Sequence, residues 1–286
     1  MLITKFEKSV LMTGVGGASS VNLIIHLQEK GFFVVGVDSN KNAPGFLFAD
    51  KSYVMPPCSN SRYPALIKKI CGDDNISFVI PLIDEELLSL KGIETSSIKV
   101  ICPNVDFSRK IMDKYLLVKE LEKLSLNFPP TSLLSNLSGF NSFPAVVKPR
   151  LGRGSRSLHF LDNKNQLEKL ILSEKLDLEK FVVQKKIEGD EYTVSVVVLP
   201  DNKLVSVVPK KIIEKKGITR CAVTENNSLI RKYCKLIVEN LEPGNSFNAQ
   251  LIIDKYTKLP YVFEINSRFS TTVTLTIQAG VDEIFL

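Results

Sequence analysis

Apolar and polar positions in the first part of the chain follow a strand, helix, strand pattern. Two apolar runs, at residues 9–13 and 32–38, flank a glycine-containing turn and a stretch at 21–31 whose apolar positions recur at helical spacing. This order predicts a βαβ unit wound around a parallel sheet. The elements expected to extend the unit are a helix at 63–75 and strands at 76–82 and 97–103. The pattern therefore predicts one α/β lobe over residues 1–105.

A proline-containing break separates this lobe from the rest of the chain. A helical pattern at 106–124 is followed by NFPPTS at 127–132, which is typical of a boundary between lobes. The elements expected after the break are two short strands within 143–161, strands at 181–187, 192–199, 204–213, 247–256 and 260–268, and helices at 165–176 and 228–241. EGDE at 188–191 is expected to be a loop between two strands. We therefore predict an α/β fold with a second domain over 106–286.

Composition indicates a soluble globular protein with local anion sites. The chain has 286 residues, 44% of them hydrophobic and 24% charged, and a net charge of +6. The excess comes from scattered lysines and from two clusters, KPRLGRGSR at 148–156 and PKKIIEKK at 209–216. No basic helix interleaved with aromatic residues accompanies them. Local anion binding is therefore favoured over nucleic-acid binding, and no nucleic-acid partner is expected.

Cysteine and histidine usage narrows the chemistry. The five cysteines are far apart without a CxxC pair, and there are only two histidines, so neither zinc nor a histidine-activated nucleophile is favoured. The odd number of cysteines and the absence of a secretory leader predict a reducing, cytoplasmic location. The apolar run at 9–17 is too short for a membrane span, and no membrane partner is expected.

The two last apolar segments carry a set of oxygen ligands. Alternation along a strand places Glu264, Asn266 and Arg268 on one face, and the turn DKYTKLP predicts a hairpin that brings Gln250 near them. One carboxylate and two amide carbonyls form a hard-oxygen set suited to Mg²⁺. We therefore expect a Mg-nucleotide ligand. The alternative is a surface ion pair between Glu264 and Arg268, with Asn266 starting a turn.

The glycine turn at 14–18 permits three interpretations. Asp38 ends the second strand, where a ribose-binding acid stands in dinucleotide-binding folds. However, Ser19 replaces the third glycine of GxGxxG. The turn is therefore a dinucleotide site, a contact for another anion such as a substrate carboxylate, or a tight turn with a structural role only. No GxxxxGK[ST] sequence occurs, which excludes a P-loop enzyme.

Two further segments suggest contacts with a nucleotide. Lys148 ends an apolar strand and precedes the glycine-containing loop 152–156, a combination that binds phosphate oxygens or forms an ordinary hairpin turn. The segment 184–187 followed by EGDE is suited to recognising an adenine edge and ribose hydroxyls, or is a charged turn. Asp84, Glu85 and Glu86 lie where a strand gives way to a helix, and either contact an amino substrate or favour the helix N-terminus.

Taken in order, these segments resemble the ATP-grasp superfamily, most closely the ATP-grasp half of the carbamoyl-phosphate synthase large subunit and related carboxylate-amine ligases. The resemblance covers essentially the whole chain. It implies a Rossmann-like pre-ATP-grasp domain at 1–105 and a two-lobed ATP-grasp domain at 106–286, with a lid lobe at about 127–195. Family members usually continue further, so the resemblance also implies that the ATP-grasp domain is truncated at Leu286.

The resemblance also assigns roles to individual residues. The implied nucleotide-binding residues are Lys114, Lys148, Gly154, Ser155, Gln184, Lys185, Ile187 and Glu191, with a less specific loop at Gly217, Ile218 and Thr219. The implied metal ligands are Gln250, Glu264 and Asn266. Lys148 and Arg268 are the implied catalytic residues, because they would neutralise charge on the transferred phosphate. Gln184 departs from the family pattern, in which Glu is frequent, and the loop 152–156 has fewer glycines than the synthase.

The implied reaction is ATP-dependent activation of a small carboxylate to an acyl phosphate, followed by attack of an amine or ammonia. ATP and Mg²⁺, which Mn²⁺ can replace, are the implied cofactors, and the resemblance admits a homodimer. Carbamoyl phosphate synthesis itself is disfavoured because that enzyme uses two ATP clamps and one is present here. The alternatives are an ATP-binding protein without ligase activity and an NAD-binding oxidoreductase.

Overall fold

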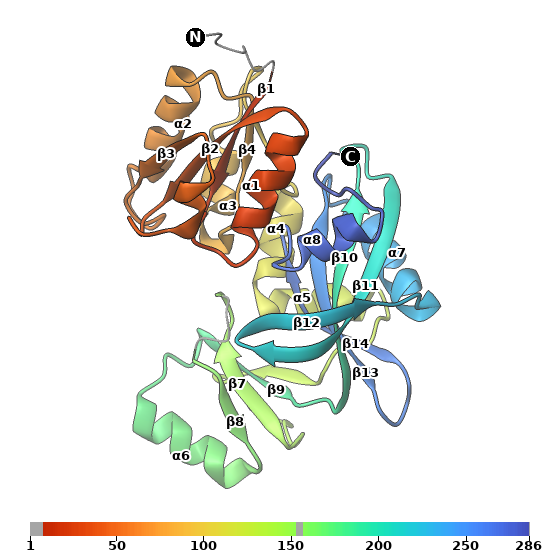
Figure 1. Cartoon of the computed structure of the whole chain (residues 1–286). Helices are drawn as coiled ribbons and strands as arrows, with labels where there is room; N and C mark the ends of the chain where they lie inside the picture. The colour runs from red at the N-terminus through yellow and green to blue at the C-terminus, as the bar shows by residue number, and fades with distance from the viewer. Residues whose placement is uncertain (1–7, 153–156, 286) are drawn as a thin grey trace, which may run out of the picture. The chain divides into compact units, whose positions relative to one another are not determined.

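The computed structural model describes residues 8–152 and 157–285, which form two compact units. Of the described residues, the first unit comprises 8–105 and 267–285, and the second comprises 106–152 and 157–266 (Figure 1). The long segment of the first unit ends at Val105. Residues 267–285, however, belong to the first unit rather than to the second, because Phe269 and Val273 are buried in the hydrophobic core of the first unit.

The first unit is built on a five-stranded parallel sheet in the order β3-β2-β1-β4-β5. Its strands are β1 (Lys8–Thr13), β2 (Phe32–Asp38), β3 (Lys51–Val54), β4 (Phe78–Ile80) and β5 (Lys99–Val100). Its helices are α1 (Ser20–Glu29), α2 (Tyr63–Asp73), α3 (Leu87–Lys91) and α8 (Val273–Gln278), with short 3₁₀ turns η1 (Pro44–Leu47) and η2 (Asp84–Glu86). Strands β1 and β2 are almost fully buried because helices cover a parallel sheet, as their unbroken apolar runs predict.

The second unit contains two antiparallel sheets (Figure 1). The five-stranded sheet has the order β12-β11-β10-β13-β14, with β10 (Gly189–Val198), β11 (Leu204–Lys216), β12 (Ile218–Thr224), β13 (Phe247–Asp254) and β14 (Pro260–Asn266). The four-stranded sheet has the order β6-β9-β7-β8, with β6 (Thr131–Leu133), β7 (Ala145–Pro149), β8 (His159–Leu161) and β9 (Phe181–Lys185). The helices are α4 (Val105–Met112), α5 (Lys114–Lys123), α6 (Lys164–Glu174) and α7 (Ser228–Leu241).

Three expectations from the sequence about local structure differ from what the structure shows. The helical pattern at 106–124 is two helices, because Asp113 is extended (φ −87°, ψ 113°) and begins α5 as its N-cap. The segment EGDE is not a loop, since β10 begins at Gly189. A Cβ at Gly189 would lie 1.9 Å from the Ile253 carbonyl oxygen, so only glycine allows β10 and β13 to approach there. Along the chain, β9 is therefore the last strand of the four-stranded sheet, and β10 belongs to the five-stranded sheet. A lid lobe that extends to residue 195 would include part of β10.

The five-stranded sheet has one apolar and one polar face. Alternate residues of β10, such as Val194 and Val196, enter a core formed with α4, α5 and α7, in which the Phe107 and Phe247 rings lie 5.0 Å apart. The intervening residues of β10, such as Thr193, point to the opposite face. That polar face carries most of the candidate chemistry.

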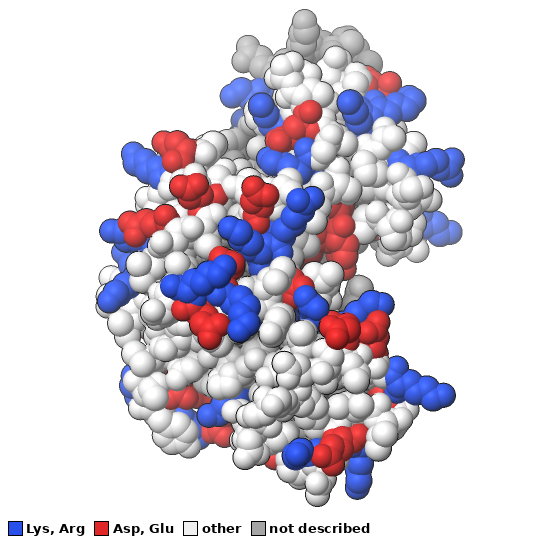
Figure 2. All heavy atoms as spheres, turned by 180° about the vertical axis from the view of Figure 1, so that it is seen from behind, with Lys and Arg blue, Asp and Glu red and all other residues white. Residues whose placement is uncertain are grey.

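No helix among the described residues is long and apolar enough to cross a membrane. On the face shown in Figure 2, Lys and Arg side chains are interspersed with Asp and Glu. A mixed arrangement of this kind is typical of a solvated surface.

Candidate active site

The structure brings the three expected metal ligands together on the polar face. Strands β13 and β14 form the expected hairpin, in which Gln250 is directly opposite Glu264 and Asn248 is opposite Asn266. Directly opposite residues of an antiparallel pair lie on the same face, with Cβ atoms about 5 Å apart. Asn266 is buried and Glu264 is half-buried, so the single carboxylate stays accessible beside two amide groups.

A β-bulge decides which way Glu264 points. The register runs Gln250 to Glu264 and then Leu251 to Val262, which leaves Phe263 as an extra residue in β14. Without the bulge, Val262 and Glu264 would share a face. With it, Val262 enters the apolar core while Glu264 lies beside Gln250 on the polar face.

Lys148 is the residue before the last of β7 and is buried, with 5% of its surface exposed. Its ammonium donates a long hydrogen bond, 3.5 Å, to the Phe263 carbonyl and lies 5.5 Å from the centre of the Phe263 ring. Burial lowers the pKa of Lys148 to about 7, against the opposing effect of the Glu264 carboxylate, and the charges of Lys114 and Lys215 lower it further. Lys148 therefore contacts the residue that precedes Glu264, one of the metal-ligand candidates.

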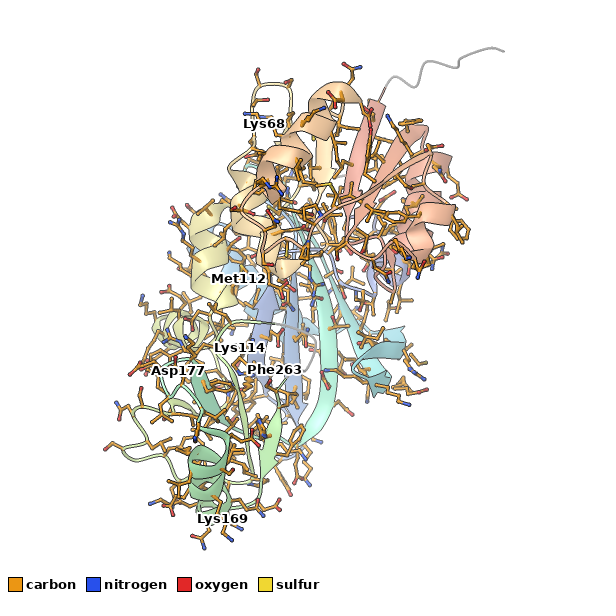
Figure 3. The ribbon with its side chains drawn as sticks, turned by 90° about the vertical axis from the view of Figure 1, so that its left-hand side faces the viewer. Lys68, Met112, Lys114, Lys169, Asp177 and Phe263 are labelled. Atoms are coloured by element: carbon orange, nitrogen blue, oxygen red, sulfur yellow. The ribbon has the colours of Figure 1, made fainter. Side chains whose placement is uncertain are left out.

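Lys114 is also buried and is held beside the loop that follows β7 (Figure 3). Its ammonium donates to the Gly152 carbonyl at 2.9 Å, and its backbone N–H donates to the Arg150 carbonyl at 3.0 Å. Gly154 and Ser155, expected to contact phosphates, lie outside the described residues. Lys114 and Lys148 therefore belong to one cluster at the base of that loop.

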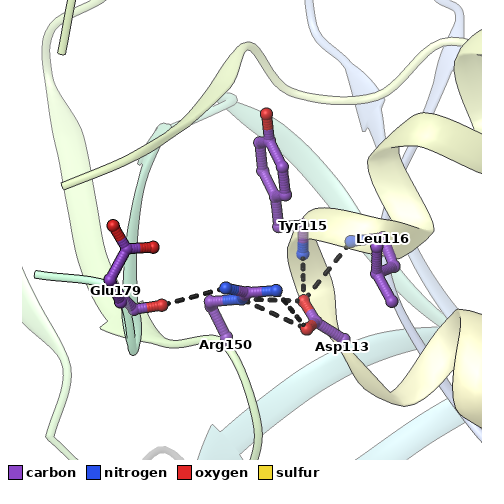
Figure 4. A network of polar contacts seen from close by, with 5 residues as sticks. All are labelled: Asp113, Tyr115, Leu116, Arg150 and Glu179. Atoms are coloured by element: carbon purple, nitrogen blue, oxygen red, sulfur yellow. Dashed lines mark hydrogen bonds and ion pairs between the residues drawn. The ribbon is translucent and has the colours of Figure 1, made fainter. Parts of the chain in front are cut away.

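A polar network joins this cluster to the start of α5 (Figure 4). The Asp113 carboxylate accepts from the backbone N–H groups of Tyr115 and Leu116 and caps the helix. The same carboxylate accepts from the Arg150 guanidinium, with Nη2 and Oδ2 2.7 Å apart. Arg150 also donates to the Glu179 carbonyl at 3.0 Å. This network therefore fixes the residue before Lys114 and the segment that follows Lys148.

The residues expected to contact adenine and ribose lie where β9 passes into β10. Gln184 is buried and its amide donates to the Thr131 hydroxyl at 2.8 Å. Lys185 is exposed, whereas Ile187 is buried. Glu191, the expected ribose acid, forms an ion pair with Lys215 of β11. Gly217, with φ +73°, makes the tight turn between β11 and β12, which brings the expected loop 217–219 to the end of that hairpin.

Arg268 does not continue the alternation predicted for it. Strand β14 ends at Asn266, and Arg268 lies in the following bend, within the first unit. Its Nε donates to Asp84 Oδ2 at 2.9 Å and its Nη1 donates to the Phe269 carbonyl at 3.0 Å. Asp84 is thus engaged with a cation rather than serving only the helix N-terminus. Glu86 is fully buried and accepts from the Tyr63 hydroxyl at 2.6 Å.

In the glycine turn of the first unit, the Asp38 carboxylate takes the place that a bound anion would occupy. The Gly16 N–H, which would face an anion in a dinucleotide site, donates to Asp38 Oδ2 at 2.7 Å. Asp38 also accepts from the Asn40 N–H through its other oxygen. This geometry favours the structural interpretation of the turn over dinucleotide binding.

Three residues of the site region, Asp113, Arg150 and Lys215, are not predicted by the sequence pattern. Arg150 and Lys215 lie in the two basic clusters, for which the sequence predicts only local anion binding. Asp113 precedes a helical stretch at a typical N-cap position, a signal that the continuous pattern at 106–124 concealed. Their ion pairs, Asp113 with Arg150 and Lys215 with Glu191, could not be found from sequence because the partners are distant in the chain.

The fold and the site together define an ATP-grasp protein. The chain belongs to this family, since the model of the ATP-grasp domain matches residues 111–272, and the model of the PylC-like N-terminal domain matches residues 10–103. The family expected from the sequence is therefore confirmed, and with it the α/β class.

The curated relatives are formate-dependent phosphoribosylglycinamide formyltransferases. The protein from Prochlorococcus marinus (strain MIT 9515) is 27% identical over 169 residues, which cover 56% of this chain and 42% of that protein. The protein from Sulfurovum sp. (strain NBC37-1) is 26% identical over 163 residues, which cover 54% and 40%. The chain therefore spans less than half the length of these relatives.

Solved structures share the fold over nearly the whole chain. An ADP complex of N5-carboxyaminoimidazole ribonucleotide synthetase has a TM-score of 0.76 at 15% identity, covering 94% of this chain and 72% of that chain. L-amino acid ligase from Bacillus licheniformis has a TM-score of 0.72 at 17% identity, covering 98% and 73%. Carbamoyl-phosphate synthase, the family member expected to be most similar, is a looser fit to this chain than these ATP-grasp proteins.

Proposed function

We propose that the chain is an ATP-dependent, ADP-forming carboxylate-amine ligase that works through an acyl phosphate. The observation that carries this proposal is that a set of oxygen ligands for a metal lies beside buried lysines. Lys148 contacts Phe263, the residue that precedes Glu264, and lies with Lys114 at the base of the glycine-containing loop. Family membership supports the same conclusion.

Gln250, Glu264 and Asn266 would hold Mg²⁺, or Mn²⁺ in its place. These three residues would supply one carboxylate and two amide oxygens from neighbouring positions of the β13–β14 hairpin. That set fits a hard cation that takes its remaining ligands from phosphate and water. When bound, the cation would neutralise phosphate charge.

The chain's own cations would bind and orient the nucleotide. Lys148 and Lys114 would contact the phosphates, and a buried ammonium is an effective partner because little water competes for it. Ile187 and Lys185 would border the adenine, Gln184 would brace that segment through Thr131, and Glu191 would accept from the ribose hydroxyls. Gly154 and Ser155 would close over the phosphates.

Arg268 would steady the transferred phosphate or the acyl phosphate. Its Nε donates a hydrogen bond to Asp84 and its Nη1 donates one to the Phe269 carbonyl, while its Nη2 has no hydrogen-bond partner among the described residues. A guanidinium oriented in this way presents donors to an anion without losing its own position. Catalysis by these residues consists of positioning and charge neutralisation, without a covalent nucleophile.

The substrates would be a small carboxylate and an amine or ammonia. The curated relatives are named as formate-dependent enzymes, which makes formate the first carboxylate to test. Hydroxylamine can replace an unidentified amine, because it converts an acyl phosphate into a stable hydroxamate.

The test is to incubate the protein with Mg-ATP, hydroxylamine and single small carboxylates, and to measure ADP and hydroxamate together. We expect both products in equal amounts, and only with a suitable carboxylate. Nucleotide binding in a thermal-shift assay without carboxylate-dependent ADP release from any acid would instead indicate a nucleotide-binding protein. Binding of NADH without binding of ATP would indicate an oxidoreductase.

A further inference from the structure

Lys215 is paired with the residue that the proposed function assigns to ribose. Its ammonium forms an ion pair with Glu191, and the side chains of the two residues are 32% and 27% exposed. Glu191 lies near the start of β10, on the polar face of the sheet. Lys215 lies near the end of β11, beside the turn at Gly217. The register of β11 shifts twice just before Lys215, and these irregularities let its side chain reach Glu191.

Lys215 also lies on the face that carries the metal-ligand candidates. Its partner Glu191 shares the polar face of β10 with Thr193, and Thr193 is directly opposite Gln250 of β13. In keeping with this position, the charge of Lys215 is one of those that lower the pKa of Lys148. Lys148 and Lys114 are buried and held by the Phe263 and Gly152 carbonyls. Lys215 differs from them because its known partner is a carboxylate that the nucleotide would need.

This arrangement sets up a competition for Glu191. The Lys215 ammonium binds Glu191 through Oε1, so ribose hydroxyls that donate to both oxygens of this carboxylate would compete with the ammonium for that oxygen. The released ammonium carries a full positive charge on a flexible four-carbon stem, and the nearest large negative charge would be the triphosphate. A partly exposed ion pair is weak, so the exchange costs little.

We propose that Lys215 is a nucleotide-binding residue that changes partners, leaving Glu191 when the ribose hydroxyls bind there and then contacting the phosphates. The inference rests on the proposed function, since it requires ATP to bind at this face. It couples recognition of the ribose to neutralisation of the phosphates, so that a nucleotide lacking the hydroxyls would not recruit Lys215.

The chain offers a matched control on the same two strands. Lys211 of β11 pairs with Asp190 of β10, with Nζ and Oδ2 2.7 Å apart and a side-chain exposure of 32% for Lys211. Lys211 is directly opposite Tyr192, whose side chain enters the apolar core, so this ion pair lies on the opposite face of the sheet. Removing Lys211 changes net charge as much as removing Lys215 does.

The experiment measures dissociation constants of ATP and 2′,3′-dideoxy-ATP by calorimetry for the wild type, Lys215→Met, Lys215→Arg and Lys211→Met. We expect Lys215→Met to weaken ATP binding about tenfold, as for the loss of one charge-assisted hydrogen bond. Its binding of the dideoxy nucleotide should stay within about twofold of the wild type, because there Lys215 never leaves Glu191. Lys215→Arg should restore ATP binding, and Lys211→Met should change neither nucleotide.

Each other outcome is decisive. Unchanged ATP binding by Lys215→Met would remove Lys215 from the nucleotide site. An equal loss for both nucleotides would show a phosphate contact without partner exchange, and a similar loss in Lys211→Met would show only an effect of net charge. If the wild type binds no ATP, the proposed function itself fails, whereas the first three outcomes leave that function intact and overturn this inference alone.

Discussion

Asp113 binds Arg150 through both carboxylate oxygens at the residue where α4 gives way to α5. The Arg150 Nε lies 3.2 Å from Oδ1 and 3.1 Å from Oδ2, and Nη2 lies 2.7 Å from Oδ2. One carboxylate therefore caps a helix and fixes the strand end that precedes the glycine-containing loop. Because Lys114 is the next residue and its N–H donates to the Arg150 carbonyl, this ion pair also positions the two buried lysines.

Two substitutions separate these effects. Asp113→Asn keeps an N-cap side chain but removes the ion pair, and we expect it to lower the free energy of unfolding by about 1 kcal/mol. Asp113→Ala removes both contacts and should cost about 2 kcal/mol. Urea unfolding measures both values. Equal losses for the two variants would show that the helix cap contributes nothing at this position.

Glu264 supplies the only carboxylate of the proposed metal site. Glu264→Gln should abolish carboxylate-dependent ADP release and weaken binding of Mg-ATP more than binding of metal-free ATP, since an uncharged amide holds a divalent cation poorly. The measurements are turnover and nucleotide affinity with and without Mg²⁺. Glu225→Gln, in which the altered residue binds Tyr192, is a control remote from the polar face. Normal turnover in Glu264→Gln would remove Glu264 from the site.

Lys148 predicts a pH dependence of nucleotide binding. Burial holds the pKa of Lys148 near 7 in the free protein, and a bound polyphosphate should raise that pKa. Affinity should therefore be fully present below pH 7 and should fall by up to tenfold per unit as pH rises above 7, until the pKa of the complex is reached.

Calorimetry in two buffers of different ionisation enthalpy tests this linkage. Near pH 8.5 ATP binding should take up about one proton, because the free Lys148 is then mostly neutral. Lys148→Arg should take up none, since its guanidinium stays charged throughout this range. Equal proton uptake by the two proteins would assign the titration to another group.

The core of the second unit predicts a stability difference between two phenylalanines. Phe247 is 1% exposed and packs on Phe107, so Phe247→Ala should lower the free energy of unfolding by about 3 to 5 kcal/mol. Phe160 is 65% exposed, and Phe160→Ala should cost less than about 1 kcal/mol. Denaturant unfolding compares them, and similar losses would contradict the core assignment.

Local pattern predicted the elements that bury a regular face and missed a strand that buries none. The apolar runs of β1, β2 and β10 and the amphipathic α7 are evident because burial on one or both faces imposes a period on many consecutive residues. Strand β5 is only Lys99–Val100, since just these residues pair with β4 within the expected strand at 97–103. Strand β12 was not predicted because most of its residues are exposed, which leaves no alternation to detect.

The amino-acid sequence by itself determined the family, the ligand types and the order of the elements, because residue chemistry and hydrophobic period are properties of the chain. Only the tertiary structure decided which groups meet. The bulge at Phe263 turns Glu264 toward Gln250, the end of β14 at Asn266 sends Arg268 to Asp84, and the register of β11 brings Lys215 to Glu191. Each of these pairings depends on strand register or chain packing across a distance in sequence, which no local pattern encodes.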